Sequence, residues 1–139
     1  MIDRPRQLAG WAAVMGLLLI WLLLALANLV VPWVVIGASM EPTLEQGDRV
    51  LVDLWSYRQR SPRGGEVALL ASPAGLPIVK RVAAEGTGAD RGDGSDLWVL
   101  GDNPRASGDS REFGRVPEQR FRGRLCWCYW PPSRFGPVR

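Results

Sequence analysis

Lysine is the residue type that first points to chemistry, because the chain contains only one. Of its 17 basic residues, 16 are arginine, and the exception is Lys80. A solvated lysine is protonated at neutral pH, but burial among apolar neighbours such as Ile78, Val79 and Val82 can lower its pKa by several units. Arginine cannot lose its proton in this way. Lys80 is therefore either a general base or one lysine that remains by chance in an arginine-rich composition.

The chain contains no histidine, which excludes a Ser-His-Asp triad and disfavours a zinc site built from protein side chains. A serine nucleophile would then need a lysine or a carboxylate as its base. Ser39 lies in the segment 37–44, between Gly37 and Pro42. Gly37 permits close backbone approach, and Pro42 fixes the turn that follows. In such a turn the Ser39 N–H could point at a developing oxyanion.

A second polar segment, 101–111, is rich in side chains that form hydrogen bonds and ends in Asp109, Ser110 and Arg111. On its own it is equally well explained as a surface turn of Asp, Asn and Gly with an ion pair. Together, Ser39, Lys80 and this segment fit a serine/lysine peptidase site.

These residues follow a long apolar segment. From Trp11 to Val31 every residue is apolar or glycine except Asn28, and 21 residues of helix span about 30 Å, the thickness of a bilayer's hydrocarbon core. Trp11 and Trp33 bracket the segment, and Pro32 is expected to end the helix. We predict a retained transmembrane helix over 11–33 after a short cytoplasmic tail, 1–10. The alternative is a cleavable signal peptide, whose apolar region would be shorter, about 7–15 residues.

The flanking residues Arg4 and Arg6 favour a cytoplasmic N-terminus and therefore a catalytic domain on the outer face of the membrane. The signal is weak, because the rest of the chain is also rich in arginine, and a domain on the cytoplasmic face stays open. The net charge of +3 is too small to indicate nucleic-acid binding.

After residue 36 the pattern changes to short apolar runs separated by glycine and proline, which predicts a mainly β catalytic domain over 34–131. Residues 84–95 are expected to form an exposed hairpin loop, and 132–139 a loosely ordered C-terminal tail. Cys126 and Cys128 should share one face of a strand and serve as packing residues, because a Cys-x-Cys pair alone is a poor metal site. The predicted strands are 49–54, 66–70, 76–82, 96–100 and 123–129.

Three segments in this order resemble the signature segments of type I signal peptidases: residues 39–44, 80–82, and 101–103 with 107–111. Two further segments are similar to parts of that family, 47–52 to the strand after the nucleophile and 113–117 to the closing segment. The likeness covers about residues 37–130. It implies a compact β-rich domain, no metal or organic cofactor, and precursor proteins with small residues before the cleaved bond as substrates.

The resemblance also implies a role for each matching residue. Ser39 would be the nucleophile and Lys80 the general base. Ser107 would orient the lysine amine. Asp109 and Arg111 would brace their loop, and Asp102 would pair with Arg81, the residue after the lysine.

This chain departs from the family pattern in three places. Gly37 lacks the hydroxyl that some members place in the oxyanion hole, and residues 84–88 do not follow the usual glycine- and proline-containing segment. Only 20 residues separate Lys80 from Gly101, where large bacterial members insert a subdomain. The chain therefore resembles a minimal catalytic core.

In this short length and in three segments, the chain looks most like the nickel-type superoxide dismutase maturation proteases. The segments are 79–83, 98–104 and 129–132. A cytosolic precursor of that kind would need a cytosolic active site, which conflicts with the orientation expected from Arg4 and Arg6. Other hypotheses are a general type I signal peptidase, a related self-cleaving repressor-type protease, and a membrane-anchored β domain without activity. The apolar segment 11–31 counts against the repressor type, which is soluble.

Overall fold

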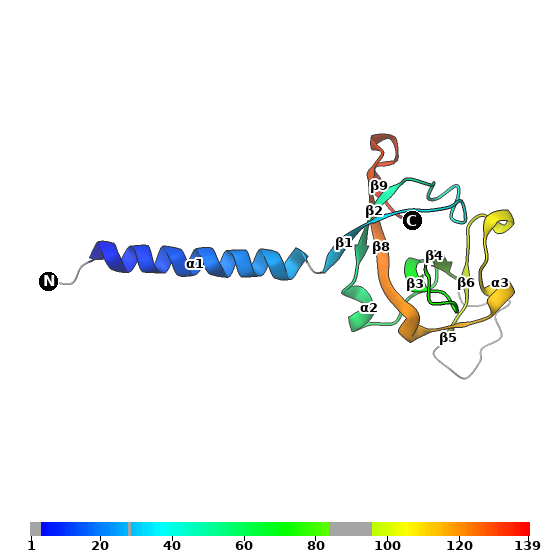
Figure 1. Ribbon diagram of the computed structural model, residues 1–139, viewed down its shortest axis with the longest axis horizontal. Coiled ribbons are helices and arrows are strands. Elements are labelled where there is room, and N and C mark those ends of the chain that lie inside the picture. The colour runs from blue at the N-terminus through cyan, green and yellow to red at the C-terminus, as the bar shows by residue number, and fades with distance from the viewer. Residues whose placement is uncertain (1–3, 28, 84–95) are drawn as a thin grey trace.

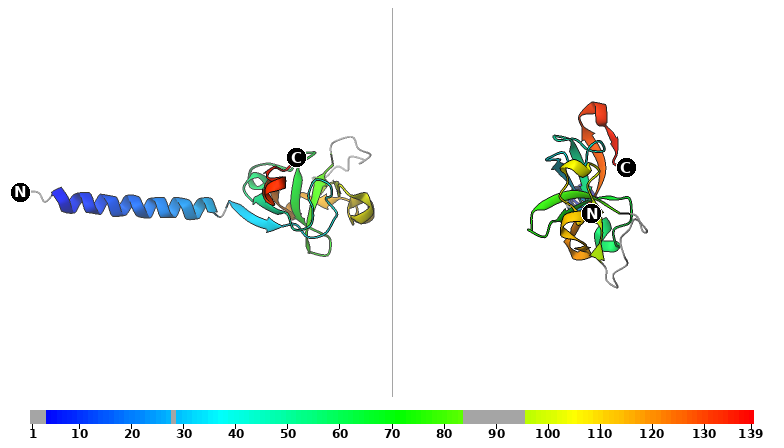
Figure 2. Two further views of the ribbon diagram at one scale, coloured as in Figure 1. Left: turned by 90° about the horizontal axis from the view of Figure 1, so that it is seen from above. Right: turned by 90° about the vertical axis from the view of Figure 1, so that its right-hand side faces the viewer.

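The computed structural model describes residues 4–27, 29–83 and 96–139. They form one long N-terminal helix followed by a β domain, and the helix projects away from the domain as a rod (Figures 1 and 2). The predicted mainly β fold class is confirmed for the domain. The hairpin loop expected over 84–95 lies outside the described residues.

Helix α1 runs from Arg4 to Ala27 and so includes most of the segment 1–10 that was expected to be a separate tail. Its large apolar side chains between Trp11 and Leu23 are exposed rather than packed on the β domain. Within the described residues, no helix meets the combined length and hydropathy required for a membrane span.

The C-terminal boundary predicted for this helix was wrong. Val30–Val34 is not helical but forms strand β1, which pairs antiparallel with β2 (Arg49–Asp53), so that Val31 lies opposite Val52 and Trp33 opposite Val50. Val31 and Trp33 pack against the hydrophobic core, which explains why this apolar segment is drawn into the sheet. Pro32 is tolerated because β1 is an edge strand, where a missing N–H breaks no inner ladder.

The main sheet has the order β1-β2-β8-β3-β4-β6, with β9 pairing on β8. Every predicted strand is present, although the segment 96–100 is divided between two sheets. Its first half pairs in a separate two-stranded sheet, β5-β7. The remaining strands are β3 (Val67–Ala71), β4 (Pro77–Val82), β5 (Asp96–Leu97), β6 (Val99–Leu100), β7 (Val116–Pro117), β8 (Phe121–Trp130) and β9 (Gly136–Pro137).

Both faces of the sheet are buried at strand β3. Val67 and Leu69 belong to one hydrophobic cluster, and Ala68 and Leu70 belong to the other. The first cluster also contains Met40 and Leu44 from the turn that carries Ser39. The second contains Val82 of β4, the strand of Lys80, and Val99 of β6, the strand that leads into the 101–111 loop. The two polar segments therefore rest on a shared rigid sheet.

Strand β8 contains two β-bulges in its pairing with β2, because two residues of β8 lie opposite one of β2 at Cys126 and again at Tyr129, and its register with β3 also shifts at Arg122. The first bulge breaks the alternation that was expected to place both cysteines on one face. Cys128 is buried in the core, whereas Cys126 is half-buried and donates through Sγ to the Leu51 carbonyl at 3.3 Å. Both thiols are free.

The segment 131–139 is ordered, which corrects the prediction of a loose tail. It contains a 3₁₀ helix, η3 (Pro132–Arg134), and strand β9. The Val138 N–H donates to the Cys126 carbonyl at 3.1 Å, and Val138 packs on the core. These backbone bonds and apolar contacts explain why a sequence rich in Pro and Arg does not detach.

Candidate active site

Ser39 and Lys80 line the same cavity, which has a volume of about 140 Å³. The two residues come from different parts of the sheet: Ser39 from the turn between β1 and β2, and Lys80 from β4. The rest of the wall is mostly apolar, with Val35, Ile36 and Ile78 among its residues. The cavity therefore offers a small, largely apolar space next to one hydroxyl and one amine.

Lys80 is held in the middle of β4, where the strand register places it opposite Ala68 of β3. Its side chain is only 4% exposed. Burial lowers the pKa of Lys80, because a charged amine is poorly solvated there. The carboxylates of Asp109 and Glu112 oppose this shift, and the guanidinium of Arg111 adds to it. The net effect favours the neutral amine, the form that can accept a proton.

Ser39 lies in a turn that backbone hydrogen bonds hold both where its two ends meet and within it. Its two ends are joined by the Val35 N–H, which donates to the Asp48 carbonyl at 2.8 Å. Inside, the Leu44 N–H donates to the Met40 carbonyl at 2.9 Å, and both of these side chains are buried. The Ser39 carbonyl accepts from the Asn103 N–H at 3.0 Å, which ties the turn to the loop 101–111.

Gly101 is the point where this loop comes closest to Ser39. A Cβ atom placed on Gly101 would lie 2.1 Å from Ser107 Oγ and 2.6 Å from the Ser39 carbonyl oxygen. Neither distance is possible for a real side chain. Glycine is therefore required here for close approach, and it allows the Ser107 side chain and the Ser39 backbone to meet at one place.

Asp109 organises the rest of the loop and is fully buried. Its Oδ2 accepts from Ser107 Oγ at 2.7 Å and from the Gly101 N–H at 2.9 Å, and Arg111 binds both carboxylate oxygens, with Nε 2.9 Å from Oδ1. Burial alone would raise the pKa of Asp109, but the hydrogen bonds from Arg111, Gly101 and Ser107 outweigh it and hold the pKa far below its usual range. Asp109 also caps the short helix α3 (Ser110–Phe113) through its bond from the Arg111 N–H.

Arg81 and Asp102 form the other expected pair. Arg81 Nε donates to Asp102 Oδ1 at 2.8 Å and Nη2 to Oδ2 at 2.6 Å. Arg81 also reaches the Gly65 carbonyl at 2.8 Å and Thr43 Oγ1 at 3.3 Å, so that it links β4 to the Ser39 turn. Burial raises the pKa of Asp102, but the hydrogen bonds from Arg81 and Thr43 more than compensate and leave it below its usual value.

All seven residues singled out in the sequence lie around this one region. Among the described residues, however, Lys80 Nζ forms no hydrogen bond with either Ser39 Oγ or Ser107 Oγ, so the structure shows a shared cavity rather than a closed dyad. Catalytic hydrogen bonds often tighten only when substrate is bound. Sequence reasoning missed the backbone roles of Gly101 and Asn103; the Gly-Asp-Asn segment marked the place but not the contacts.

Comparison with known proteins gives consistent results. A family model described as "Signal peptidase, peptidase S26" matches residues 8–91 and 93–130. The chain is 36% identical to mitochondrial inner membrane protease subunit 1 of Xenopus tropicalis, over 74% of this chain and 71% of that protein. It is 36% identical to mitochondrial ATP-independent inner membrane protease subunit 1a of Arabidopsis thaliana, over 74% of this chain and 72% of that protein. It is 29% identical to probable signal peptidase I-1 of Synechocystis sp., over 72% of this chain and 71% of that protein.

Proposed function

Since the chain belongs to the signal peptidase family, peptidase S26, we propose that it is a membrane-attached serine endopeptidase that removes N-terminal leader peptides from precursor proteins. Its nucleophile is Ser39 and its general base is Lys80. The observation that carries the assignment is the cavity that these two residues share, with the lysine amine buried and its pKa lowered.

The first half of the reaction forms an acyl-enzyme. The neutral Lys80 amine takes the proton of the Ser39 hydroxyl while Oγ attacks the carbonyl carbon of the scissile peptide bond. The tetrahedral intermediate carries its negative charge on the former carbonyl oxygen, toward which the Ser39 N–H is the proposed donor. The Lys80 ammonium then gives its proton to the leaving amine, and the C–N bond breaks.

The second half restores the enzyme. A water molecule gives a proton to the neutral Lys80 amine and attacks the acyl carbon, and the ammonium returns that proton to Ser39 Oγ as the leader is released. The proposed role of Ser107 is to orient the lysine amine. Asp109 supports this role by accepting the Ser107 hydroxyl proton in a hydrogen bond, which leaves the Ser107 lone pairs free to accept from Lys80.

Membrane attachment through the N-terminal segment is part of the proposal. The apolar run from Trp11 to Val31 and the exposed apolar side chains of α1 support it, and a lipid bilayer would cover this surface. Arg4 and Arg6 at the start of the helix favour a single-pass arrangement with the catalytic domain on the outer face.

The finer identity of the precursor rests on sequence resemblance alone. The segments 79–83, 98–104 and 129–132 favour the precursor of a nickel-type superoxide dismutase. A cytosolic precursor of this kind requires the catalytic domain on the cytoplasmic face, whereas a secreted precursor fits the outer face. Protease accessibility of the domain in intact cells and in inverted membrane vesicles therefore discriminates the two substrate classes.

The decisive experiment uses full-length protein in detergent with candidate precursors, followed by N-terminal sequencing of the products. Wild-type protein should release one defined new N-terminus and should be acylated by a serine-directed inhibitor. Ser39→Ala should keep its circular dichroism spectrum and lose both signals, because alanine has no attacking oxygen. Wild-type turnover by purified Ser39→Ala would exclude Ser39 as the nucleophile.

A further inference from the structure

The turn that carries Ser39 is held from two sides. We define the nucleophile loop as residues 35–48 and the C-terminal clasp as residues 131–139. On one side the loop contacts the peptidase machinery, through the Asn103 N–H and through Arg81 on Thr43 Oγ1. On the other side it contacts the clasp, about 90 residues away in the sequence.

Among the described residues, the side-chain hydrogen bonds between the clasp and the loop come from Arg134. Its Nε donates to Asp48 Oδ2 at 2.9 Å and its Nη1 to Glu45 Oε1 at 2.8 Å. Its Nη2 donates to the Thr43 carbonyl at 2.8 Å and to the Pro42 carbonyl at 3.2 Å. One planar guanidinium therefore binds four acceptors of the loop, two of them backbone atoms three and four residues from Ser39.

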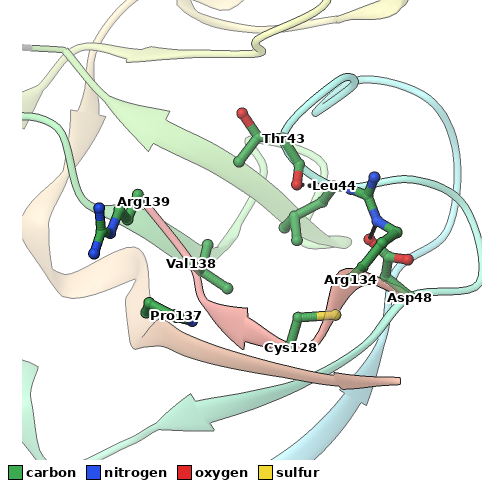
Figure 3. A pocket seen from close by; sticks show the side chains of 8 residues that line it. All are labelled: Thr43, Leu44, Asp48, Cys128, Arg134, Pro137, Val138 and Arg139. Atoms are coloured by element: carbon green, nitrogen blue, oxygen red, sulfur yellow. Dashed lines mark hydrogen bonds and ion pairs between the residues drawn. The ribbon is translucent and has the colours of Figure 1, made fainter. Parts of the chain in front are cut away.

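The surroundings make this contact difficult to replace. The Asp48 side chain is only 3% exposed, so that its charge needs a partner, and its Oδ2 also accepts from the Glu45 N–H at 2.9 Å. Beside the bridge, a cavity of about 200 Å³ separates the loop from the clasp, with Leu44 and Val138 in its wall (Figure 3). Beside this cavity, the hydrogen bonds from Arg134 therefore hold the two segments together.

The clasp is itself anchored on strand β4, next to Lys80. The Arg139 carbonyl accepts from Arg81 Nη2 at 3.1 Å, and Arg81 is the neighbour of Lys80 in β4. The clasp therefore contacts the nucleophile loop through Arg134 and the strand of the general base through Arg139.

We propose that Arg134 is a positioning residue for the nucleophile: it fixes the 42–48 part of the nucleophile loop and thereby the place of Ser39 relative to Lys80. The proposal deepens the peptidase function proposed above and rests on it. Arg134 does not line the cavity shared by Ser39 and Lys80, so its loss should affect the reaction step more than substrate binding.

The test compares full-length wild-type protein in detergent with Arg134→Ala and Arg134→Lys. Arg60→Ala is the matched control, because Arg60 also uses two nitrogens for carboxylate oxygens, both of Glu66, is similarly exposed, and lies away from the nucleophile loop. Two quantities are measured for each protein: kcat and KM on one leader peptide, and amide hydrogen exchange of peptides that cover residues 35–48.

Arg134→Ala should lower kcat by about 10- to 100-fold while KM changes by less than about threefold, because a small misplacement of the nucleophile reduces the chemical step. Exchange at the Leu44 amide should become faster by about tenfold, since the loop opens more often. Arg134→Lys should recover part of both effects, because an ammonium can pair with Asp48 but cannot span four acceptors. Arg60→Ala should change neither kcat nor loop exchange.

The proposal would be overturned by loop exchange in Arg134→Ala that equals wild type, or by faster exchange with unchanged kcat. An equal loss of kcat in Arg60→Ala would also overturn it, because the effect would then be one of general stability. If wild-type protein cleaves no leader peptide, the peptidase function fails, and hydrogen exchange still decides whether Arg134 holds the loop.

Discussion

Lys80 is placed where burial destabilises the charged form of its amine. It lies in the middle of a strand and is almost fully buried, and this burial lowers its pKa; the carboxylates of Asp109 and Glu112 oppose the shift without reversing it, and Arg111 adds to it. A purely structural ion pair would gain from the opposite environment, with a carboxylate in direct contact. The environment of Lys80 therefore favours proton transfer over charge pairing.

The first prediction concerns pH. Because the base must be neutral, kcat/KM should rise with pH through the Lys80 pKa and reach a plateau below the pH at which a solvated lysine would titrate. Lys80→Arg should be inactive across this range, since guanidinium stays protonated. Ser107→Ala should lose less activity, because it removes an orienting group and leaves the base. The measurement is turnover of one peptide against pH for the three proteins; an active Lys80→Arg enzyme contradicts the general-base role.

The second prediction concerns Gly101. Gly101→Ala should lower kcat/KM by about 100-fold, because the new methyl group must displace Ser107 or the Ser39 backbone and a shift of about 1 Å is enough for such a loss. Gly108→Ala in the same loop is the matched control, since its Cβ meets only the flexible end of Glu112, at 3.3 Å. Equal activity of the two variants would show that the close approach at Gly101 is not needed.

At the scale of elements, the loop 101–111 is braced from within by one carboxylate. Asp109 joins the backbone of Gly101, the Ser107 hydroxyl and the Arg111 guanidinium. All three contacts fall within eleven residues, so that the loop keeps its shape independently of the distance to the next strand. This explains how a short connection after β4 can still present Ser107 beside Gly101, where the Ser39 backbone also approaches.

The third prediction tests this brace through acid stability. The pKa of folded Asp109 lies below that of an unfolded aspartate, so its contribution is present above about pH 4 and is lost as the pH falls further. Asp109→Asn should be less stable than wild type by about 2 kcal/mol at pH 7, because a buried, multiply bonded charge is removed. Urea unfolding at several pH values measures this difference. A difference that does not shrink below pH 4 would contradict the assignment.

The strands were predictable because their apolar runs are short and are separated by glycine and proline turns. That Ser39, Lys80 and the 101–111 loop would lie together was predictable because they carry unusual residue types in a known order; their catalytic roles stay a prediction. The strand formed by segment 30–34 was not predictable. A valine-rich run next to a long apolar helix has a composition that fits a helix or a strand, and only pairing with β2 decides between the two. The bulges of β8 and the contacts of Arg134 depend on partners far away in the sequence, which local patterns do not contain.

At the scale of the whole molecule, an apolar rod is joined to a compact domain at β1. The junction is sharp: α1 ends at Ala27, and the Leu29 carbonyl already accepts from the Leu54 N–H at 2.8 Å. The domain therefore begins several residues earlier than the expected boundary at 34.

The fourth prediction follows from this boundary. A protein without residues 1–28 should fold and leave the membrane fraction, because the whole sheet remains. Removing residues 1–34 should destabilise the domain by at least about 3 kcal/mol, since Val31 and Trp33 no longer pack on the core. Fractionation and thermal unfolding by circular dichroism check both expectations. Equal melting temperatures of the two truncated proteins would show that β1 is not an integral part of the domain.

The position of β8 in the sheet has a consequence for the order of events in biosynthesis. β8 lies between β2 and β3, so the sheet joins the half that carries Ser39 to the half that carries Lys80 through a strand that is made after both. Contacts between segments so distant in the chain form slowly. While residues 121–130 are still to be translated, we therefore expect Ser39 and Lys80 not yet to share their cavity, and we expect peptidase activity only when synthesis of the chain is nearly complete.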